Sequence, residues 1–155
     1  PAMIASSAVV QQTLVSAGAT IRGTVRNSIV SPGVVVEPGA VVHDSVLLPG
    51  VRVGAGALVH RAVIDQDAVI GVSARVGDRW SEATEEDDGS PRVTVIGEGS
   101  WIAAGASVEP SDVIAPFSGR GAIPPSMLGG EEAAGIAAAA RWAAQQRRSL
   151  STSRP

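Results

Sequence analysis

The sequence predicts an all-β protein, a left-handed parallel β-helix of hexapeptide repeats with about five to six coils and a C-terminal α-helix. Three observations lead to this prediction. A similar pattern of seventeen residues occurs three times in succession, over residues 28–44, 45–61 and 62–78. Steps of six residues, each led by an aliphatic side chain, resume after residue 95. Hydrophobic residues make up 45% of the chain but aromatic residues only 3%, so small and β-branched side chains must fill the core.

The three repeats place aliphatic residues in three columns. In a hexapeptide pattern each side of a three-sided coil is a short strand, and its aliphatic side chain points inward. Coils then stack about 4.8 Å apart as parallel ladders. Three sides of six residues require eighteen, so a period of seventeen means that one corner is tighter by one residue. We therefore expect three inward columns, which are Ile29, Val46 and Val63; Val36, Val53 and Ile70; and Val42, Val59 and Val76.

The pattern continues on both sides of these repeats. Residues 4–12 align with the second half of a repeat, and residues 13–27 form a coil shortened by two. The later six-residue steps are led by Ile96, Ile102, Val108 and Ile114. A β-sandwich is the alternative, but it would require irregularly spaced turns and more aromatic residues.

The expected organisation has four parts. Residues 1–78 form β-helix coils, residues 79–92 an acidic loop insertion, and residues 93–118 further hexapeptide coils. Residues 119–155 form a linker, a C-terminal helix over 131–148 and a frayed tail. The helix has Glu in its first turn and Arg in its last, which suits the helix dipole. The acidic loop lacks the alternate spacing of a calcium loop, so we expect no metal there.

Composition excludes several classes of function. The formal net charge of −3 argues against a nucleic-acid partner, which would favour a clustered basic surface. The chain has no Cys and therefore no disulfide framework or thiolate chemistry. We see no signal peptide and no apolar run long enough to span a bilayer, so the expected location is cytoplasmic, with no membrane partner.

Two histidines, His43 and His60, are seventeen residues apart and stack on one outward face. Hexapeptide-repeat acyltransferases place a histidine between subunits as a general base, so either residue could serve a trimeric, acetyl-CoA-dependent enzyme. A zinc enzyme on this scaffold needs three histidines, and two cannot build that site. We expect a solvated ladder, with no metal site and no catalytic residues.

Arginines form a second candidate site. Arg52 and Arg61 lie on one coil and Arg75 one coil above, so their guanidinium groups could bind a phosphorylated ligand on one face. Exposed solubilising charges are the plainer alternative. Residues 119–126, GRGAIPPS, lack the lysine of a phosphate-binding loop, so the sequence offers no nucleotidyltransferase active site.

The stretch from Leu14 to Asp65, with its phrases NSIVS, SVLLPGVRVG and HRAVID, resembles the C-terminal β-helix of bacterial ADP-glucose pyrophosphorylase (glucose-1-phosphate adenylyltransferase). The later phrase VTVIGEGSWI is similar to the continuation of that domain, and the resemblance covers residues 1–102. Pro1-Ala2 would fit the junction that leads out of the catalytic domain, which predicts that this chain is a piece of a longer protein.

The resemblance implies a non-catalytic regulatory and oligomerisation domain, inactive alone and without a cofactor of its own. The parent enzyme makes ADP-glucose and pyrophosphate from ATP and glucose 1-phosphate, with Mg²⁺, in glycogen biosynthesis. Implied partners are an N-terminal nucleotidyltransferase domain, sister subunits and a sugar-phosphate effector. Arg61 matches a family arginine and is the first effector-binding candidate, followed by Arg52 and His60. Gln66 departs from the family, which often has a basic residue there. The alternatives are a free-standing acyltransferase and a bare scaffold for partner chains.

Overall fold

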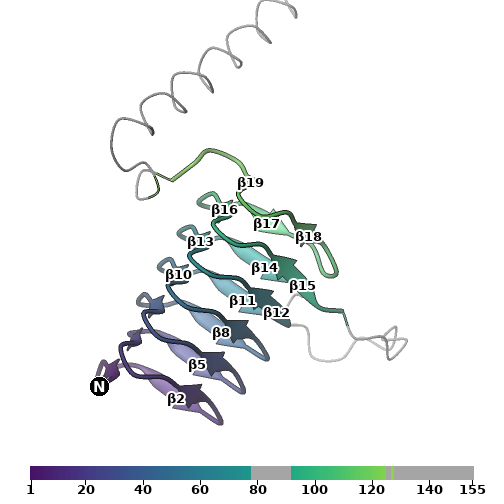
Figure 1. The fold of residues 1–155 in the computed structure, drawn as a ribbon. Helices are drawn as coiled ribbons and strands as arrows, with labels where there is room; N and C mark the ends of the chain where they lie inside the picture. The colour runs from purple at the N-terminus through teal and green to yellow at the C-terminus, as the bar shows by residue number, and fades with distance from the viewer. Residues whose placement is uncertain (78–91, 125–126, 128–155) are drawn as a thin grey trace, which may run out of the picture. The chain divides into compact units, whose positions relative to one another are not determined.

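The computed structural model describes residues 1–77, 92–124 and 127. The predicted C-terminal helix, the tail and nearly all of the acidic loop lie outside these residues. The chain divides into two compact units, Pro1–Ala122 and Ile123–Pro155. The first unit holds every strand from β1 to β19 (Figure 1).

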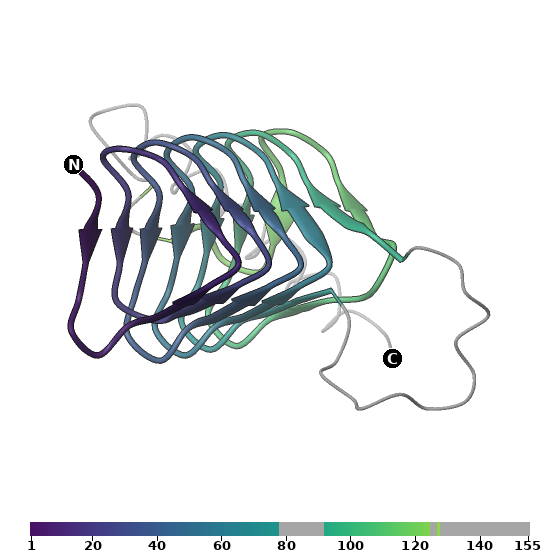
Figure 2. The ribbon, with the colours of Figure 1, turned by 90° about the horizontal axis from the view of Figure 1, so that it is seen from below.

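The strands form three parallel sheets, which we call sheets A, B and C, and the chain visits the three in turn (Figure 2). Sheet A contains β1 (Met3–Ile4), β4 (Thr20–Ile21), β7 (Val35–Val36), β10 (Arg52–Val53), β13 (Val69–Ile70), β16 (Trp101–Ile102) and β19 (Gly119–Arg120). Sheet B contains β2 (Val9–Gln11), β5 (Thr24–Arg26), β8 (Val41–His43), β11 (Leu58–His60), β14 (Arg75–Gly77) and β17 (Ser107–Val108). Sheet C contains β3 (Leu14–Val15), β6 (Ile29–Val30), β9 (Val46–Leu47), β12 (Ala62–Ile64), β15 (Thr94–Ile96) and β18 (Val113–Ile114).

This architecture confirms the predicted all-β parallel β-helix, with about six coils, and is consistent with the left-handed coil of a hexapeptide repeat. Each strand pairs in parallel with the equivalent strand of the next coil, so Val35 lies beside Arg52 and Arg52 beside Val69. Thr20 pairs with Val35, which confirms the early coil shortened by two residues. Sheet A continues to β19, which pairs with β16 past the predicted end of the coils at residue 118. Among the described residues, no helix has the length and apolar character to cross a membrane.

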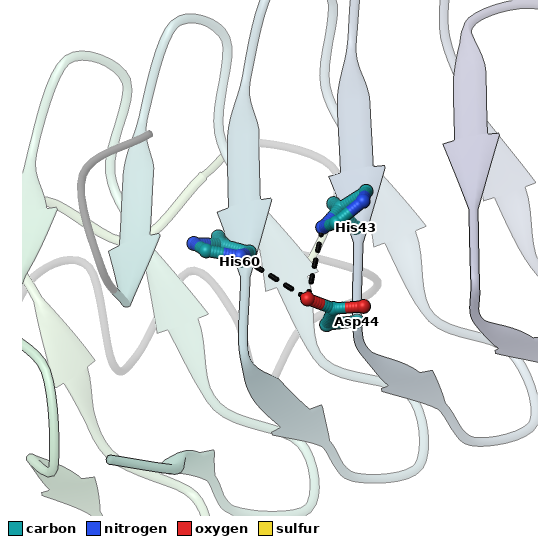
Figure 3. Close-up of side chains that lie close together, drawn as sticks. All are labelled: His43, Asp44 and His60. Carbon is teal, nitrogen blue, oxygen red and sulfur yellow. Dashed lines mark ion pairs between the residues drawn. The ribbon is translucent and has the colours of Figure 1, made fainter. Parts of the chain in front are cut away.

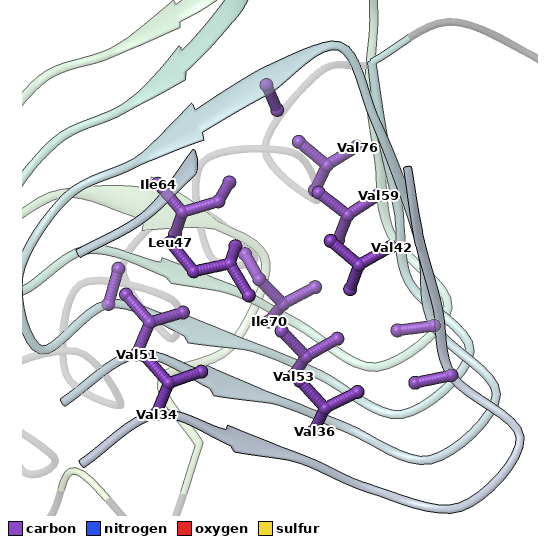
Figure 4. Packing of buried hydrophobic residues seen from close by; sticks show 14 of the residues in the cluster. Val34, Val36, Val42, Leu47, Val51, Val53, Val59, Ile64, Ile70 and Val76 are labelled. Carbon is purple, nitrogen blue, oxygen red and sulfur yellow. The ribbon is translucent and has the colours of Figure 1, made fainter. Parts of the chain in front are cut away.

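Two of the three predicted inward columns are confirmed (Figure 4). The columns of Val36 and of Val42 are buried, with no member more than 1% exposed. The leading residues of the later hexads, from Ile96 to Ile114, are buried as well. Among the described residues, aliphatic side chains therefore form the core of the tube without any aromatic side chain.

The third predicted column is wrong by one residue. Ile29 is 46% exposed, and the column of sheet C that points inward is that of Val30, Leu47 and Ile64, each fully buried. Side chains alternate along a strand, so the residue that follows Ile29 takes the inward position. Both residues of these strands are aliphatic, so the residue types alone did not mark which one faces the core.

The outward positions of sheet C are aliphatic too, and we call this column the apolar stripe. Its members are in register from coil to coil, and three of them, Leu14, Ile29 and Val113, are exposed. The apolar stripe consists of Leu14, Ile29, Val46, Val63, Val95 and Val113.

The corners of the coil are of two kinds. Residues 31–34 join sheet C to sheet A, and residues 37–40 join sheet A to sheet B; each turns on a Pro-Gly pair whose glycine has positive φ. The corner from sheet B to sheet C is tighter, since only Asp44 and Ser45 separate β8 from β9. This tight corner is why the period is seventeen residues rather than eighteen.

Candidate functional site

The tight corner brings the two histidines together. His43 ends β8 and His60 ends β11, and the two residues are in register on neighbouring strands of sheet B. Their ring centroids are 5.3 Å apart and the rings are inclined by 48°. The predicted histidine ladder is therefore confirmed.

The histidine side chains are less solvated than expected. They retain 23% exposure at His43 and 16% at His60. Both rings contact the carboxylate of Asp44, which sequence reasoning did not single out (Figure 3). The predicted solvated ladder is thus a half-buried cluster of three side chains.

Asp44 reaches both rings because of its backbone conformation. Its φ of 49° is left-handed, a conformation that Asp and Asn tolerate better than most residues. The chain therefore turns sharply after His43, and Asp44 Oδ2 lies 3.0 Å from His43 Nδ1 and 3.4 Å from His60 Nε2. The other carboxylate oxygen, Oδ1, accepts a hydrogen bond from Asn27 Nδ2, one coil below. Asn27 thereby holds Oδ2 toward the histidines.

The electrostatics of the cluster keep Asp44 ionised. Burial acts to raise its pKa, but the hydrogen bond from Asn27 and the two nearby histidines outweigh that effect. The pKa of Asp44 therefore lies below its ordinary value. At neutral pH the cluster contains a carboxylate that accepts hydrogen bonds and can bind a cation.

Cavities lie on both sides of the tight corner. One, of about 540 Å³, covers the outer face of sheet B and is lined by both histidines, Arg26 and Arg75, with apolar side chains between them. The other, of about 620 Å³, runs onto sheet C and is lined by Asn27, Asp44 and Arg61. Asp44 therefore connects the histidine face with the apolar stripe.

The structure separates the arginines that were expected to share one face. Arg52 lies on β10 in sheet A, whereas Arg75 lies on β14 in sheet B. Arg61 lies at the tight corner, with φ of 48°, and lines the cavity toward sheet C. The prediction that Arg52, Arg61 and Arg75 share one face is therefore wrong, because strands joined by a wide corner belong to different sides of the tube.

Besides Asp44, the structure adds Arg26 to the site. It is in register with His43 and lines the same cavity as His60 and Arg75. Its position seventeen residues before His43 was a signal in the sequence. Arg26 belongs to the coil shortened by two, over residues 13–27, and this irregular spacing obscured that signal.

The chain matches a known family of hexapeptide-repeat domains. Residues 3–102 match the family described as GlmU-like, C-terminal hexapeptide. Since the match covers more than half of the chain, the protein belongs to this family of hexapeptide-repeat domains.

Two curated relatives carry the same name. Glucose-1-phosphate adenylyltransferases of Streptomyces coelicolor and Streptomyces avermitilis are each 50% identical to this chain over 42 residues. The match covers 27% of this chain and 10% of each relative's length.

Solved structures with a similar fold include acetyltransferases. A mutant of GDP-perosamine N-acetyl transferase from Caulobacter crescentus, in complex with CoA and GDP-perosamine, is 21% identical with a TM-score of 0.47, over 75% of this chain and 48% of that one. The acetyltransferase domain of PglB from Neisseria gonorrhoeae, in complex with acetyl coenzyme A, is 24% identical with a TM-score of 0.41, over 74% and 51%.

Proposed function

We propose that this chain is the non-catalytic C-terminal domain of a glucose-1-phosphate adenylyltransferase-like enzyme, with roles in regulation and subunit assembly. The observation that carries the proposal is the 50% identity over 42 residues to two such enzymes. A match to a hexapeptide pattern alone would come from any member of the family. The ordered phrases from Leu14 to Asp65 add specificity, because the geometry of a coil does not require these particular residues.

The apolar stripe supports a role in assembly. Exposed Leu14, Ile29 and Val113 belong to one continuous outward column along sheet C. The members between Ile29 and Val113 are half-buried, so the column is a continuous, partly exposed apolar surface, a feature of protein interaction sites. We assign the stripe to contacts with the catalytic domain or a sister subunit.

Regulation is assigned to the tight corner. Arg61 lines a cavity of about 620 Å³ with Asn27, and its guanidinium fork suits a phosphorylated effector such as a sugar phosphate. His60 lies on the opposite side of the corner, and Arg52 on a different sheet. Arg61 is therefore the leading candidate, and Arg52 would not contribute to the same site.

Two measurements test this proposal. The isolated chain, incubated with ATP, glucose 1-phosphate and Mg²⁺, should release no pyrophosphate; robust release would overturn the non-catalytic assignment. Light scattering should show a dimer or tetramer that Ile29→Asp dissociates. Val72→Asp, at an exposed apolar position outside the stripe, should leave the assembly intact. A monomer, or equal behaviour of both variants, would contradict the assembly role.

One geometric observation favours a second candidate, a trimeric hexapeptide acyltransferase. Asp44 Oδ2 lies 3.0 Å from His43 Nδ1, the arrangement in which a carboxylate orients a histidine that acts as a general base. This reading predicts a trimer and acetyl-CoA turnover that His43→Ala abolishes. A trimer without acetyl-CoA turnover would contradict both candidates.

A further inference from the structure

The cluster at the tight corner has the donor set of a metal site. Two imidazole nitrogens and one carboxylate oxygen converge, and one ligand atom from each of His43, Asp44 and His60 lies within 4.8 Å of the others. Imidazole and carboxylate donors suit Zn²⁺ and related divalent ions, whereas Mg²⁺ prefers oxygen donors alone.

The distances fit the size of such an ion. Zinc binds histidine nitrogen and carboxylate oxygen at about 2.0–2.2 Å, so neighbouring ligands of a tetrahedral site are roughly 3.4 Å apart. The distances from Asp44 Oδ2 are 3.0 Å to His43 Nδ1 and 3.4 Å to His60 Nε2. Both distances are thus close to the separation of neighbouring ligands around one such ion.

The fold holds each ligand in place. The parallel register fixes His43 beside His60, and the left-handed turn directs Asp44 back toward them. Asn27 donates to Asp44 Oδ1, which leaves Oδ2 to face the histidines. Hydrogen bonds that orient ligands in this way are a regular feature of metal sites.

We propose that His43 Nδ1, Asp44 Oδ2 and His60 Nε2 bind a divalent transition-metal ion, with Zn²⁺ as the preferred ion. All three ligands come from one chain. One coordination position of a tetrahedral ion stays open toward the cavity on sheet B. The site goes beyond the proposed function, which does not require a metal. In the acyltransferase candidate the same two atoms, Asp44 Oδ2 and His43 Nδ1, pair with each other instead.

Nearby charges define what fills the open position. Arg26 and Arg75 line the same cavity, and their positive charges oppose a bare cation. Asp44 offsets part of this repulsion. The arginines favour an anion, such as a carboxylate or phosphate oxygen, as the fourth ligand. We therefore expect inorganic phosphate to strengthen zinc binding rather than compete with it.

Calorimetric titration of the full chain with ZnCl₂ tests the site. We expect one ion per chain, and weaker binding by more than about tenfold in His43→Ala, His60→Ala and Asp44→Asn. Asn27→Gly, which removes the orienting amide but keeps a residue that accepts positive φ, should weaken binding about tenfold. MgCl₂ should not bind at the cluster.

The controls make the test decisive. Glu37→Gln removes a carboxylate that pairs with Arg22 elsewhere on the surface, so it should leave zinc affinity unchanged. Circular dichroism of the zinc-free variants establishes that each is folded. Zinc binding should also place the remaining ring proton on Nε2 of His43 and on Nδ1 of His60, as read by long-range ¹H–¹⁵N NMR. Absence of binding, or equal binding by all variants, would overturn the proposal and indicate that the cluster is only an ion pair.

Discussion

The wide corners and the tight corner of this tube both turn the chain from one sheet to the next, but they do so with different residues. At the wide corners the residue with positive φ is most often glycine, as at Gly33, Gly39 and Gly50, although Asp67 and Ser73 hold this position in one coil. At the tight corner the backbone is equally constant, since Asn27, Asp44 and Arg61 all have φ between 46° and 49°. The side chains there nevertheless change from coil to coil. The wide corners therefore mostly use the residue type that the backbone favours, whereas the tight corner mostly carries polar side chains that can bind a ligand.

The largest effect is expected at a wide corner where the backbone of the next coil leaves no space for a Cβ. A Cβ at Gly71 would lie 2.5 Å from the backbone nitrogen of Ala104 and 2.7 Å from the carbonyl oxygen of Ile102. Gly71→Ala should cost more than about 3 kcal/mol of unfolding free energy or prevent folding, since backbone atoms of the next coil cannot move aside. At Gly105 an added Cβ meets nothing within 4 Å, so Gly105→Ala should cost only about 1–2 kcal/mol through its positive φ. Equal costs in urea denaturation would contradict this distinction.

The next largest effect is expected from substitutions that test which residues of sheet C face inward. Ile64 is fully buried, whereas Ile29 is 46% exposed on the outer face of the same sheet. Ile64→Ala should lower the free energy of unfolding by about 2–4 kcal/mol and Ile29→Ala by less than about 1 kcal/mol. The reverse order would mean that sheet C is shifted by one residue, as the sequence alone had predicted.

A smaller effect is expected from the hydroxyl that closes the tight corner. Ser45 Oγ donates to the carbonyl of His43 at 2.7 Å and accepts from the backbone N–H of Ala62 at 3.2 Å. Ser45 is 3% exposed, so Ser45→Ala should cost about 1–2 kcal/mol in thermal or urea unfolding. Ser7→Ala, at an exposed position, is the matched control and should have no measurable effect.

The sequence predicted the fold well because the period and the residue types define the coil and most of its core. The columns of Val36 and Val42 could be read from the repeat, as could the existence of one tight corner. Two features could not be read. Adjacent aliphatic residues, such as Ile29 and Val30, do not reveal which faces inward. The place of the tight corner within the coil also needed the strand boundaries.

The candidate site was harder to predict for a related reason. His43 and His60 were found because identical residues recur at the repeat spacing. Asp44 was missed because it has no acidic counterpart in the next coil, where Arg61 follows. Its contribution depends on the left-handed turn that directs its carboxylate backward. Arg52 and Arg75 appeared close in sequence, but a wide corner places them on different sheets.

Thermal unfolding of the wild type and of Asp44→Asn, each with and without Zn²⁺, tests the functional role of the tight corner most directly. Asn accepts the same φ, so without zinc the two proteins should differ by less than about 1 kcal/mol. At a zinc concentration of one hundred times Kd the wild type should gain about 2.7 kcal/mol, and the variant almost nothing. A large loss of stability in the zinc-free variant, or the same gain in both proteins, would show that the tight corner serves the fold just as the wide corners do.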